Sequence, residues 1–253
     1  MLYAEPSKLF HRLFRWYTEH YLIKRHFHHV GLRDEGAFQS LEGPVLFIMN
    51  HCSWWDGLMV YYAVQHDTSR WHYMMMDHEQ MSKYRFFRKV GAFSIHKSSI
   101  RGILQSLTHS VSLLERGQRV WIFPQGDIYH AEARPLHFQR GAAHILRRVP
   151  RTTVVPVTIY YSMCHYQKPG ATLLFGTPMS DAWDTMVQTA ITERLQQRLE
   201  RQLDKHRLEV MQAGGADVPG FGALYAPPLS TDQQFERYKR GIGRWKSFFG
   251  RSR

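Results

Sequence analysis

His51 and Asp56 belong to a polar and aromatic run, Asn50-His51-Cys52-Ser53-Trp54-Trp55-Asp56-Gly57, that directly follows the apolar stretch PVLFIMN. A histidine titrates near neutral pH and can act as a general base. A nearby carboxylate can fix the tautomer of that histidine and stabilise its imidazolium form. The two side chains can approach each other if His51 lies just before the first turn of a helix. On spacing alone, the alternative is an ordinary surface pair.

A second polar group, Phe123-Pro124-Gln125-Gly126-Asp127, also directly follows an apolar stretch. Glycine permits close backbone approach to a ligand, and successive N–H groups of a loop can bind an anion. The alternative interpretation is a plain turn that ends a strand.

Short apolar runs alternate with helical patterns between the ends of the chain. Strands are predicted at 44–50, 71–76, 92–96, 119–124, 153–161 and 172–176. Helices are predicted from Trp54 or Trp55 to Gln65, at 101–116, at about 140–148 and from about Ser180 to Val210. This order predicts an α/β fold, a single domain with a mixed, mostly parallel sheet flanked by helices, plus amphipathic terminal arms. In such folds, ligands bind at the carboxyl ends of the strands.

Two segments interrupt this pattern. Pro156 lacks an N–H group, so it predicts a strand end or a bulge within 153–161. Residues 213–230 contain four glycines and three prolines, which indicates a loop. We therefore predict a catalytic domain at 34–212, preceded by an arm at 1–33 and followed by a loop and tail at 213–253.

Most of the net charge of +12 lies at the two ends of the chain. Residues 1–33 hold six Lys/Arg against two acids, and residues 235–253 hold seven against one. Both ends place large aromatic residues among these cations, a combination typical of interfacial segments. We predict an interfacial N-terminal helix; the alternative is a first helix packed on the core. For the C-terminal tail, the alternative is a disordered basic segment. The predicted apolar stripe of the N-terminal helix is Leu9, Leu13, Trp16 or Tyr17, and Tyr21.

Basic ends of this kind bind anionic lipid or nucleic acid. The nearly neutral middle of the chain and the lack of a nucleic-acid-binding motif favour lipid. No run approaches the ~18 apolar residues that a spanning helix needs, and no secretory signal is visible. Two cysteines are too few for a disulfide framework, which favours a reducing compartment. We expect a peripheral or monotopic protein on the cytoplasmic face of a membrane.

Five short motifs occur in order over roughly residues 43–178. Their order and spacing resemble those of the glycerolipid acyltransferase family, which makes phosphatidic acid and remodels lysophospholipids. The matching residues are Asn50, His51 and Asp56; Gly91, Phe93, Ile95 and Lys97; Phe123, Pro124 and Gly126; Arg140, Gly141 and Ala142; and Val155, Pro156 and Val157.

The resemblance implies a mechanism and a set of site residues. His51, held by Asp56, removes a proton from an acceptor hydroxyl, whose oxygen attacks the thioester of an acyl-CoA or acyl carrier protein. No acyl-enzyme is needed, so neither Cys52 nor Ser53 has to be a nucleophile, and no metal or further cofactor is implied. By position, the head of the acceptor is bound by Lys97, Gln125 and Gly126, with Arg101 or Arg140 adding a cation. Arg140 is alternatively a solvated helix residue.

The acceptor half of the motif set departs from the family pattern. Gln125 stands where the family has glutamate, Asp127 where it has threonine, and Lys97 offers a point charge in place of the planar fork of arginine. A lysophospholipid, an ornithine-type lipid and a glycosylated lipid all remain candidate acceptors. A rival function is a family member that has lost catalysis and only binds lipid.

Histidines and methionines form two further clusters. His26, His28 and His29 lack further metal ligands, so we expect pH-sensitive charge at an interface and no metal site. Met74, Met75 and Met76 are predicted to pack in the core. Methionines are also adaptable, so the alternative is a groove for an acyl chain.

Overall fold

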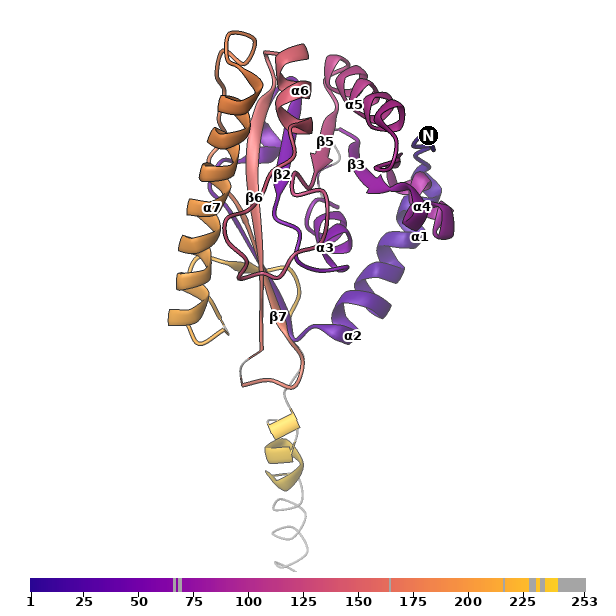
Figure 1. Ribbon diagram of the computed structural model, residues 1–253. Helices are drawn as coiled ribbons and strands as arrows, with labels where there is room; N and C mark the ends of the chain where they lie inside the picture. The colour runs from indigo at the N-terminus through magenta and orange to yellow at the C-terminus, as the bar shows by residue number, and fades with distance from the viewer. Residues whose placement is uncertain are drawn as a thin grey trace, which may run out of the picture.

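The computed structural model describes residues 1–65, 67, 70–163, 165–215, 217–227, 231–232 and 235–240. These residues form one mixed sheet of eight strands in the order β4-β3-β5-β2-β6-β7-β1-β8 (Figure 1). The strands are β1 (His29–Asp34), β2 (Val45–Met49), β3 (His72–Asp77), β4 (Ala92–Ile95), β5 (Arg119–Ile122), β6 (Thr153–Ser162), β7 (Gly170–Phe175) and β8 (Gly222–Ala223).

Five neighbouring strands, from β4 to β6, are parallel, and the antiparallel pairs are β6 with β7 and β1 with β8. Strand β7 is also parallel to β1. The α/β fold with a mixed, mostly parallel sheet is therefore confirmed. Because the carboxyl ends of β2, β3, β4, β5 and β6 share one edge, the loops that follow them meet there.

Helices cover both faces of the sheet. Apolar residues of α5, α6 and α7 pack on the face that carries Leu46 and Ile48 of β2. Helix α3 packs on the other face, which carries Val45, Phe47 and Met49. The helices are α1 (Lys8–Tyr17), α2 (Lys24–His26), α3 (Asp56–Ala63), α4 (His78–Lys83), α5 (Ile100–Glu115), α6 (Gly141–Arg148) and α7 (Gln188–Gln212), with a π-helix at Thr18–Ile23 and 3-10 helices at Phe38–Ser40 (η2) and Arg85–Val90 (η3).

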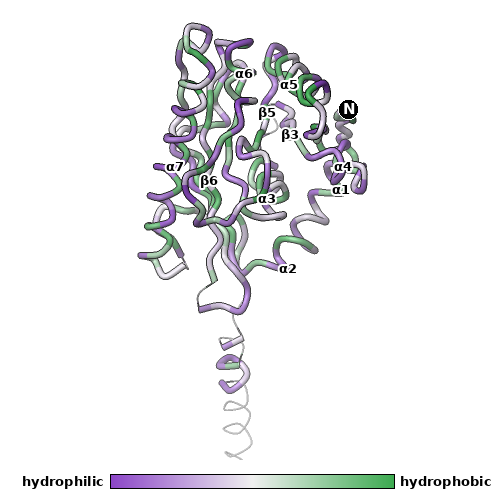
Figure 2. Tube along the Cα trace, viewed as in Figure 1, coloured by the Kyte–Doolittle hydropathy of each residue, from purple (hydrophilic) through white to green (hydrophobic). Residues whose placement is uncertain are grey.

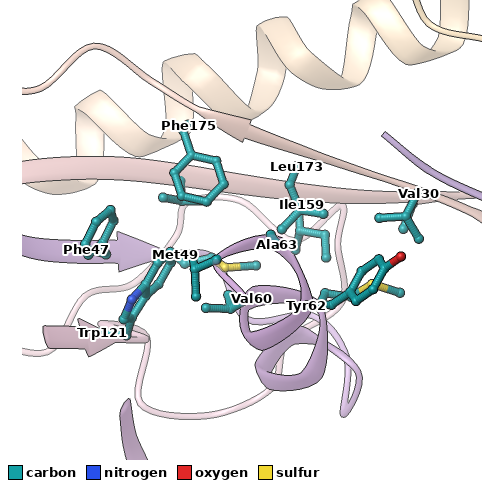
Figure 3. Packing of buried hydrophobic residues seen from close by; sticks show 14 of the residues in the cluster. Val30, Phe47, Met49, Val60, Tyr62, Ala63, Trp121, Ile159, Leu173 and Phe175 are labelled. Carbon is teal, nitrogen blue, oxygen red and sulfur yellow. The ribbon is translucent and has the colours of Figure 1, made fainter. Parts of the chain in front are cut away.

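The core is densest between α3 and the middle of the sheet. Figure 3 shows Val60 and Ala63 of α3 facing Met49 and Ile159 of the strands. Phe47 and Trp121 stack with their ring centroids 4.1 Å apart. All five residues of β2 are fully buried, as expected for a central parallel strand covered on both faces. This packing fixes the end of β2, from which His51 follows.

The last long helix begins later than the sequence predicts. Residues 180–187 are not helical, and α7 starts at Gln188. Met179 bridges Val154 of the sheet, and Trp183 is buried with its indole N–H donated to Thr152 O, 3.0 Å away. These contacts hold the segment in an irregular path before the helix begins. Purple and green alternate along α7 in Figure 2, as expected for an amphipathic helix with one face on the sheet.

Pro156 does not end its strand. It lies inside β6 and pairs with Ile48 of the parallel neighbour β2. The ladder with β7 starts only at Val157, so no N–H is needed from Pro156 on that side. The predicted strand end is therefore wrong, although pairing with β7 does stop at this residue.

Two strands lie in segments that the sequence does not mark as strands. Strand β1 occupies residues that we assigned to the N-terminal arm, and the helical part of that arm ends at His26. Strand β8, of two residues, lies in the predicted 213–230 loop and pairs with β1. Most of the predicted C-terminal tail, residues 241–253, lies outside the described residues.

The N-terminal helix has an inner and an outer face. On the inner face, Phe14 packs on Tyr61 of α3 and Phe86 of η3, with centroid distances of 5.2 and 5.6 Å. On the outer face, Leu9 is 65% exposed and Leu13 60%. The helix is thus packed on the body of the protein and still presents an apolar stripe to solvent. Within the described residues, no helix is long and apolar enough to cross a membrane.

Candidate active site

Asn50, the first residue after β2, links this strand to its neighbour β6 through two side-chain hydrogen bonds. The Asn50 side chain donates to Ile159 O (3.1 Å) and accepts from Ile159 N (2.9 Å). Asn50 is 2% exposed, so both bonds are shielded from water. They place the backbone that enters His51 at the carboxyl edge of the sheet.

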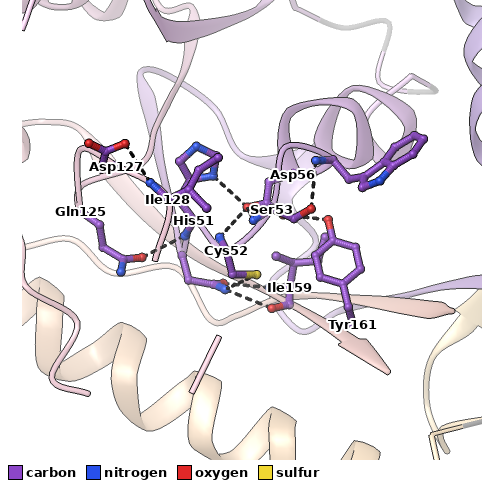
Figure 4. Close-up of polar contacts among 11 residues, drawn as sticks. His51, Cys52, Ser53, Asp56, Gln125, Asp127, Ile128, Ile159 and Tyr161 are labelled. Atoms are coloured by element: carbon purple, nitrogen blue, oxygen red, sulfur yellow. Dashed lines mark hydrogen bonds and ion pairs between the residues drawn. The ribbon is translucent and has the colours of Figure 1, made fainter. Parts of the chain in front are cut away.

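His51 and Asp56 form the predicted pair. His51 Nδ1 lies 2.8 Å from Asp56 Oδ2, and the same oxygen accepts the N–H groups of Cys52 (2.7 Å) and Ser53 (2.9 Å), as Figure 4 shows. A carboxylate only accepts, so the Nδ1 atom carries a proton, and in the neutral tautomer the lone pair is on Nε2. His51 therefore has the tautomer that a general base needs, with Asp56 fully buried behind it.

Tyr161 is a third member of this group that the sequence did not identify. Its hydroxyl donates to Asp56 Oδ1 at 2.7 Å, on the carboxylate oxygen that His51 does not use. Burial and the charge of Asp56 raise the pKa of Tyr161 well above its ordinary value, so the phenol stays protonated as a donor. The available signal was alternation along β6, because Val157, Ile159 and Tyr161 share one face of the strand.

Gln125 supports the backbone of His51. Its Oε1 accepts the His51 N–H at 2.9 Å, and Tyr129 N donates to His51 O at 3.0 Å. The Phe123 ring lies against the imidazole, with centroids 4.2 Å apart. Gln125 is 4% exposed, so in this structure its amide oxygen is engaged by the histidine that it holds in place.

The Cys52 thiol is poorly suited to nucleophilic catalysis. Burial, reinforced by the Asp56 charge, raises the pKa of Cys52 well above its ordinary value. The thiolate is the reactive form of cysteine, so this thiol stays unreactive near neutral pH. This agrees with the expectation that Cys52 does not carry the acyl group.

Gly126 and Lys97 form the second half of the site. Gly126 has φ +79, a left-handed conformation that favours glycine, and its N–H closes a turn onto Phe123 O at 3.0 Å. Lys97 Nζ donates to Gly126 O at 3.0 Å and lies 3.5 Å from Asp77 and 3.7 Å from Asp127. The lysine charge is thus shared between two carboxylates.

A cavity of about 1660 Å³ joins both halves of the site. Of the predicted residues, it is lined by His51, Lys97, Gln125, Gly126 and Arg140, whereas Arg101 does not line it. Arg140 and Arg101 both have exposed side chains.

Two of the three clustered histidines, His28 and His29, are buried and do not face an interface, whereas His26 is exposed. His28 and His29 are 8% and 7% exposed, and burial lowers the pKa of both. The His28 ring stacks on Tyr166 with a centroid distance of 3.5 Å. Burial therefore disfavours the charged form of these two imidazoles, contrary to the expectation for them. In the part of the chain that the structure describes, no group of three or more His, Cys, Asp or Glu side chains is placed to hold a metal ion.

Comparison with known proteins supplies the family. A family model described as Acyltransferase matches residues 23–160, more than half of the chain. Among curated proteins, no sequence matches this chain. The match runs from before β1 into β6 and includes both His51 and Asp56. The chain therefore belongs to the glycerolipid acyltransferase family and is an acyltransferase.

Proposed function

We propose that this enzyme moves a fatty acyl group from an acyl thioester, carried by CoA or by acyl carrier protein, to a hydroxyl group of a membrane lipid. The observation that carries the proposal is the His51–Asp56 pair at the edge of the large cavity. Two substrates have to meet at His51. Pockets that hold one drug-sized ligand measure about 300–1,000 Å³, so the cavity volume is compatible with two bound substrates.

In the proposed reaction, His51 Nε2 takes the proton of the acceptor hydroxyl as its oxygen attacks the thioester carbonyl. The tetrahedral intermediate then collapses, the C–S bond breaks, and the imidazolium returns the proton to the departing thiolate. Asp56 stays ionised and stabilises the imidazolium. The ester product and the free thiol balance the reaction without an acyl-enzyme, in keeping with the protonated Cys52.

The charges around Lys97 influence which head group of the acceptor can bind there. A phosphate monoester bound there would meet one ammonium group and the carboxylates of Asp77 and Asp127. This balance favours an acceptor whose head is zwitterionic, carries an amine or is a sugar, over a phosphate monoester such as lysophosphatidate. Arg140, exposed on the cavity rim, would contact the outer part of that head.

The acceptor resides in a membrane, and the outer face of α1 supports docking on one leaflet. Leu9, Leu13 and Trp16 are each more than half exposed on this helix. The adjoining surface at the junction of α4 and η3, which no sequence pattern had indicated, carries Tyr84 and Phe86, 40% and 39% exposed. Arginine and lysine side chains of α1 line the cavity, so a leaflet on this face would meet the cavity rim. We propose peripheral attachment to the cytoplasmic leaflet.

The test is acyl transfer by purified protein on vesicles. The enzyme is given acyl-CoA or acyl carrier protein thioesters with vesicles that contain lysophospholipid, amino-lipid or glycolipid acceptors, and products are identified by mass spectrometry. The proposal expects a new ester on a lipid hydroxyl group. Asp56→Asn should lower turnover by roughly 10²–10⁴, because an amide at this position favours the wrong histidine tautomer. Lipid binding without any ester product would support the non-catalytic rival instead.

A further inference from the structure

Arginine is concentrated on one part of the molecule, although the middle of the chain is nearly neutral. Helices α5 and α6 with their flanking residues, 100–116 and 140–151, contain six arginines and a single acidic residue, Glu115. All six arginines are exposed. Ion pairs with carboxylates are formed by Arg33, Arg88, Arg119, Arg134, Arg194 and Arg207, which all lie outside these two segments. This part of the surface therefore carries a large excess of positive charge.

The two helices form one surface because they pack closely side by side (Figure 1). A Cβ atom at Gly141 of α6 would lie 3.3 Å from Leu107 Cδ2 of α5, so the absence of a side chain lets the helices approach. At the other end of the pair, the Arg151 guanidinium donates to Glu115 O at 3.0 Å. The surface that these helices present is called the basic face below, and it is defined by Arg101, Arg116, Arg147, Arg148 and Arg151.

Two aliphatic side chains are exposed beside these arginines. Ile100 is 80% exposed and Leu104 48%, and they lie one turn apart on the same side of α5. Interfaces between proteins place apolar contacts at the centre and charged groups around them. The phosphates of a small anionic ligand would gain nothing from exposed aliphatic groups. The combination therefore fits a protein partner better than a small anion.

The cavity that contains His51 reaches this surface. Ile103 and Leu107 of α5 and Gly141 and His144 of α6 all line it, so the cavity extends between the two helices. A partner docked on the basic face would lie next to an opening that leads to the catalytic histidine.

The basic face and the proposed membrane contact belong to opposite sides of the sheet. Helix α1 packs on α3 through Phe14 and Tyr61, whose ring centroids are 5.2 Å apart. Helices α5 and α6 pack on the other face, which carries Leu46 and Ile48. With the outer face of α1 on a leaflet, the basic face stays accessible from solution. A water-soluble partner can therefore reach it while the enzyme remains on the membrane.

We infer that the acyl donor is delivered by an acyl carrier protein that docks on the basic face, with its thioester-bearing arm entering the cavity between α5 and α6. The inference rests on the proposed function and selects one of its two thioester carriers. Acyl carrier proteins are acidic, so their carboxylates complement the arginines. The arginines of α6, from Arg140 to Arg148, extend over about 12 Å at about 1.5 Å per residue, a span that suits a protein surface. Arg101, which does not line the cavity, is assigned to this docking surface and not to the acceptor.

The experiment compares palmitoyl-CoA with the palmitoyl thioester of an acyl carrier protein, using the same acceptor vesicles. Reversing two charges of the basic face, in the double variant Arg147→Glu and Arg148→Glu, should lower kcat/KM for the carrier-protein donor by about tenfold or more at low salt and change kcat/KM for palmitoyl-CoA by less than about twofold. In the wild type, the ratio of kcat/KM for the carrier protein to that for CoA should fall as salt is added, because salt screens the attraction between the two proteins.

The matched control reverses two charges elsewhere on the surface. Arg201→Glu with Lys205→Glu, at exposed positions of α7, changes the net charge equally and should keep the wild-type ratio of the two donors. Leu104→Ser should weaken use of the carrier protein at both low and high salt, because its contribution is apolar. Melting curves monitor folding, and the milder pair Arg147→Ala with Arg148→Ala should give a smaller loss in the same direction.

The outcomes separate this inference from the proposed function. Absence of an ester product from both donors would contradict the proposed function itself. Transfer from palmitoyl-CoA alone would leave the proposed function intact and overturn the inference. So would an unchanged kcat/KM for the carrier protein in the Arg147 and Arg148 variants, or an equal loss for both donors. Flotation with anionic vesicles is measured on the same variants, and a loss there with unchanged carrier-protein kinetics would show that the basic face binds lipid and that the inference is wrong.

Discussion

The hydroxyl of Tyr161 donates a hydrogen bond to Asp56 across 105 residues of sequence, at 2.7 Å and on the carboxylate oxygen that His51 leaves unused. Asp56 thus accepts from the phenol on one oxygen, and from the imidazole and two backbone N–H groups on the other. With no exposure to water, this carboxylate has its orientation set entirely by these donors. Tyr161 is therefore a positioning residue for the proposed catalytic pair.

Tyr161→Phe should lower kcat about tenfold and shift the acidic limb of the kcat/KM profile to higher pH. A carboxylate with one donor fewer carries more charge toward His51 and stabilises the imidazolium more strongly, so the base form is lost at a higher pH. The buried oxygen left without its donor should also reduce the free energy of unfolding by about 1–3 kcal/mol.

The matched control is Tyr160→Phe. Its hydroxyl bonds to Glu132 at 3.0 Å, away from the catalytic pair. This variant should keep the wild-type pH profile. An unmoved profile in Tyr161→Phe, with only a stability loss, would reduce Tyr161 to a structural role.

The second prediction concerns the acidic residues around Lys97. Asp127→Thr removes one of the two carboxylates near the ammonium group and restores the residue type of the family motif. It should lower the KM for an acceptor with a phosphate monoester head severalfold, with little change for the acyl donor. Lys97→Ala should raise the KM for acceptors. If both substitutions changed donor and acceptor constants equally, Lys97 would not be an acceptor residue.

Membrane attachment is predicted to depend on the outer face of α1. Deleting the whole arm is a poor test, because Leu2 pairs with Ser94 of β4 and Ile23 is buried in the core. The triple variant Leu9→Ser, Leu13→Ser and Trp16→Ser should instead float less with anionic vesicles, at both low and high salt. The electrostatic contribution to vesicle binding should decrease as salt is added, because salt screens the attraction between the basic side chains and the anionic lipid.

Leu208→Ser with Met211→Ser serves as the control, because these residues are similarly exposed on α7. Flotation that survives the α1 substitutions would move the membrane contact elsewhere. The other candidates are the exposed Tyr84 and Phe86 and the basic tail, most of which lies outside the described residues.

Buried His206 should make the fold sensitive to acid. Its ring is held between the hydroxyls of Thr158 and Thr172, each 2.9 Å away, and burial lowers the pKa of His206 to about 3. The unfolded chain binds a proton at this residue from about pH 6.5 downward, whereas the folded chain does not. Stability is therefore full above about pH 6.5 and falls by up to about 1.4 kcal/mol per pH unit as the pH drops toward 3.

Urea unfolding of His206→Gln across this pH range measures the effect. The variant should be less stable at neutral pH, and the slope of its unfolding free energy should decrease by about one proton. The exposed His130→Gln is the control and should keep the wild-type slope. An unchanged slope in His206→Gln would show that other buried histidines carry the acid sensitivity.

Sequence patterns predicted the features that depend on neighbouring residues. The strand predicted at 44–50 is found at 45–49, and His51 approaches Asp56 as their spacing predicted. Both features are local, as is the turn at Gly126. Contacts between distant segments were not accessible in this way. Tyr161 reaches Asp56 only through the order of strands in the sheet, and the partner of Gln125, the His51 N–H, lies 74 residues away.

The missed elements have similar causes. Strand β1 carries no long apolar run and is defined by its pairing with β7 and β8. The segment before α7 looks helical by composition, but the burial of Trp183 decides its path. The methionine run of β3 was open to two interpretations: Met74 and Met75 pack against the two core clusters, and all three methionines also line the cavity.

The central claim is that His51 is the general base of acyl transfer, and the turnover of His51→Ala tests it most directly. The variant and the wild type are compared with the same thioester and vesicle-bound acceptor, at matched melting temperature and matched vesicle binding. The account predicts a loss of turnover of at least about 10², the lower range for removal of a general base. A folded, membrane-bound His51→Ala enzyme that keeps more than about a tenth of wild-type turnover would contradict it.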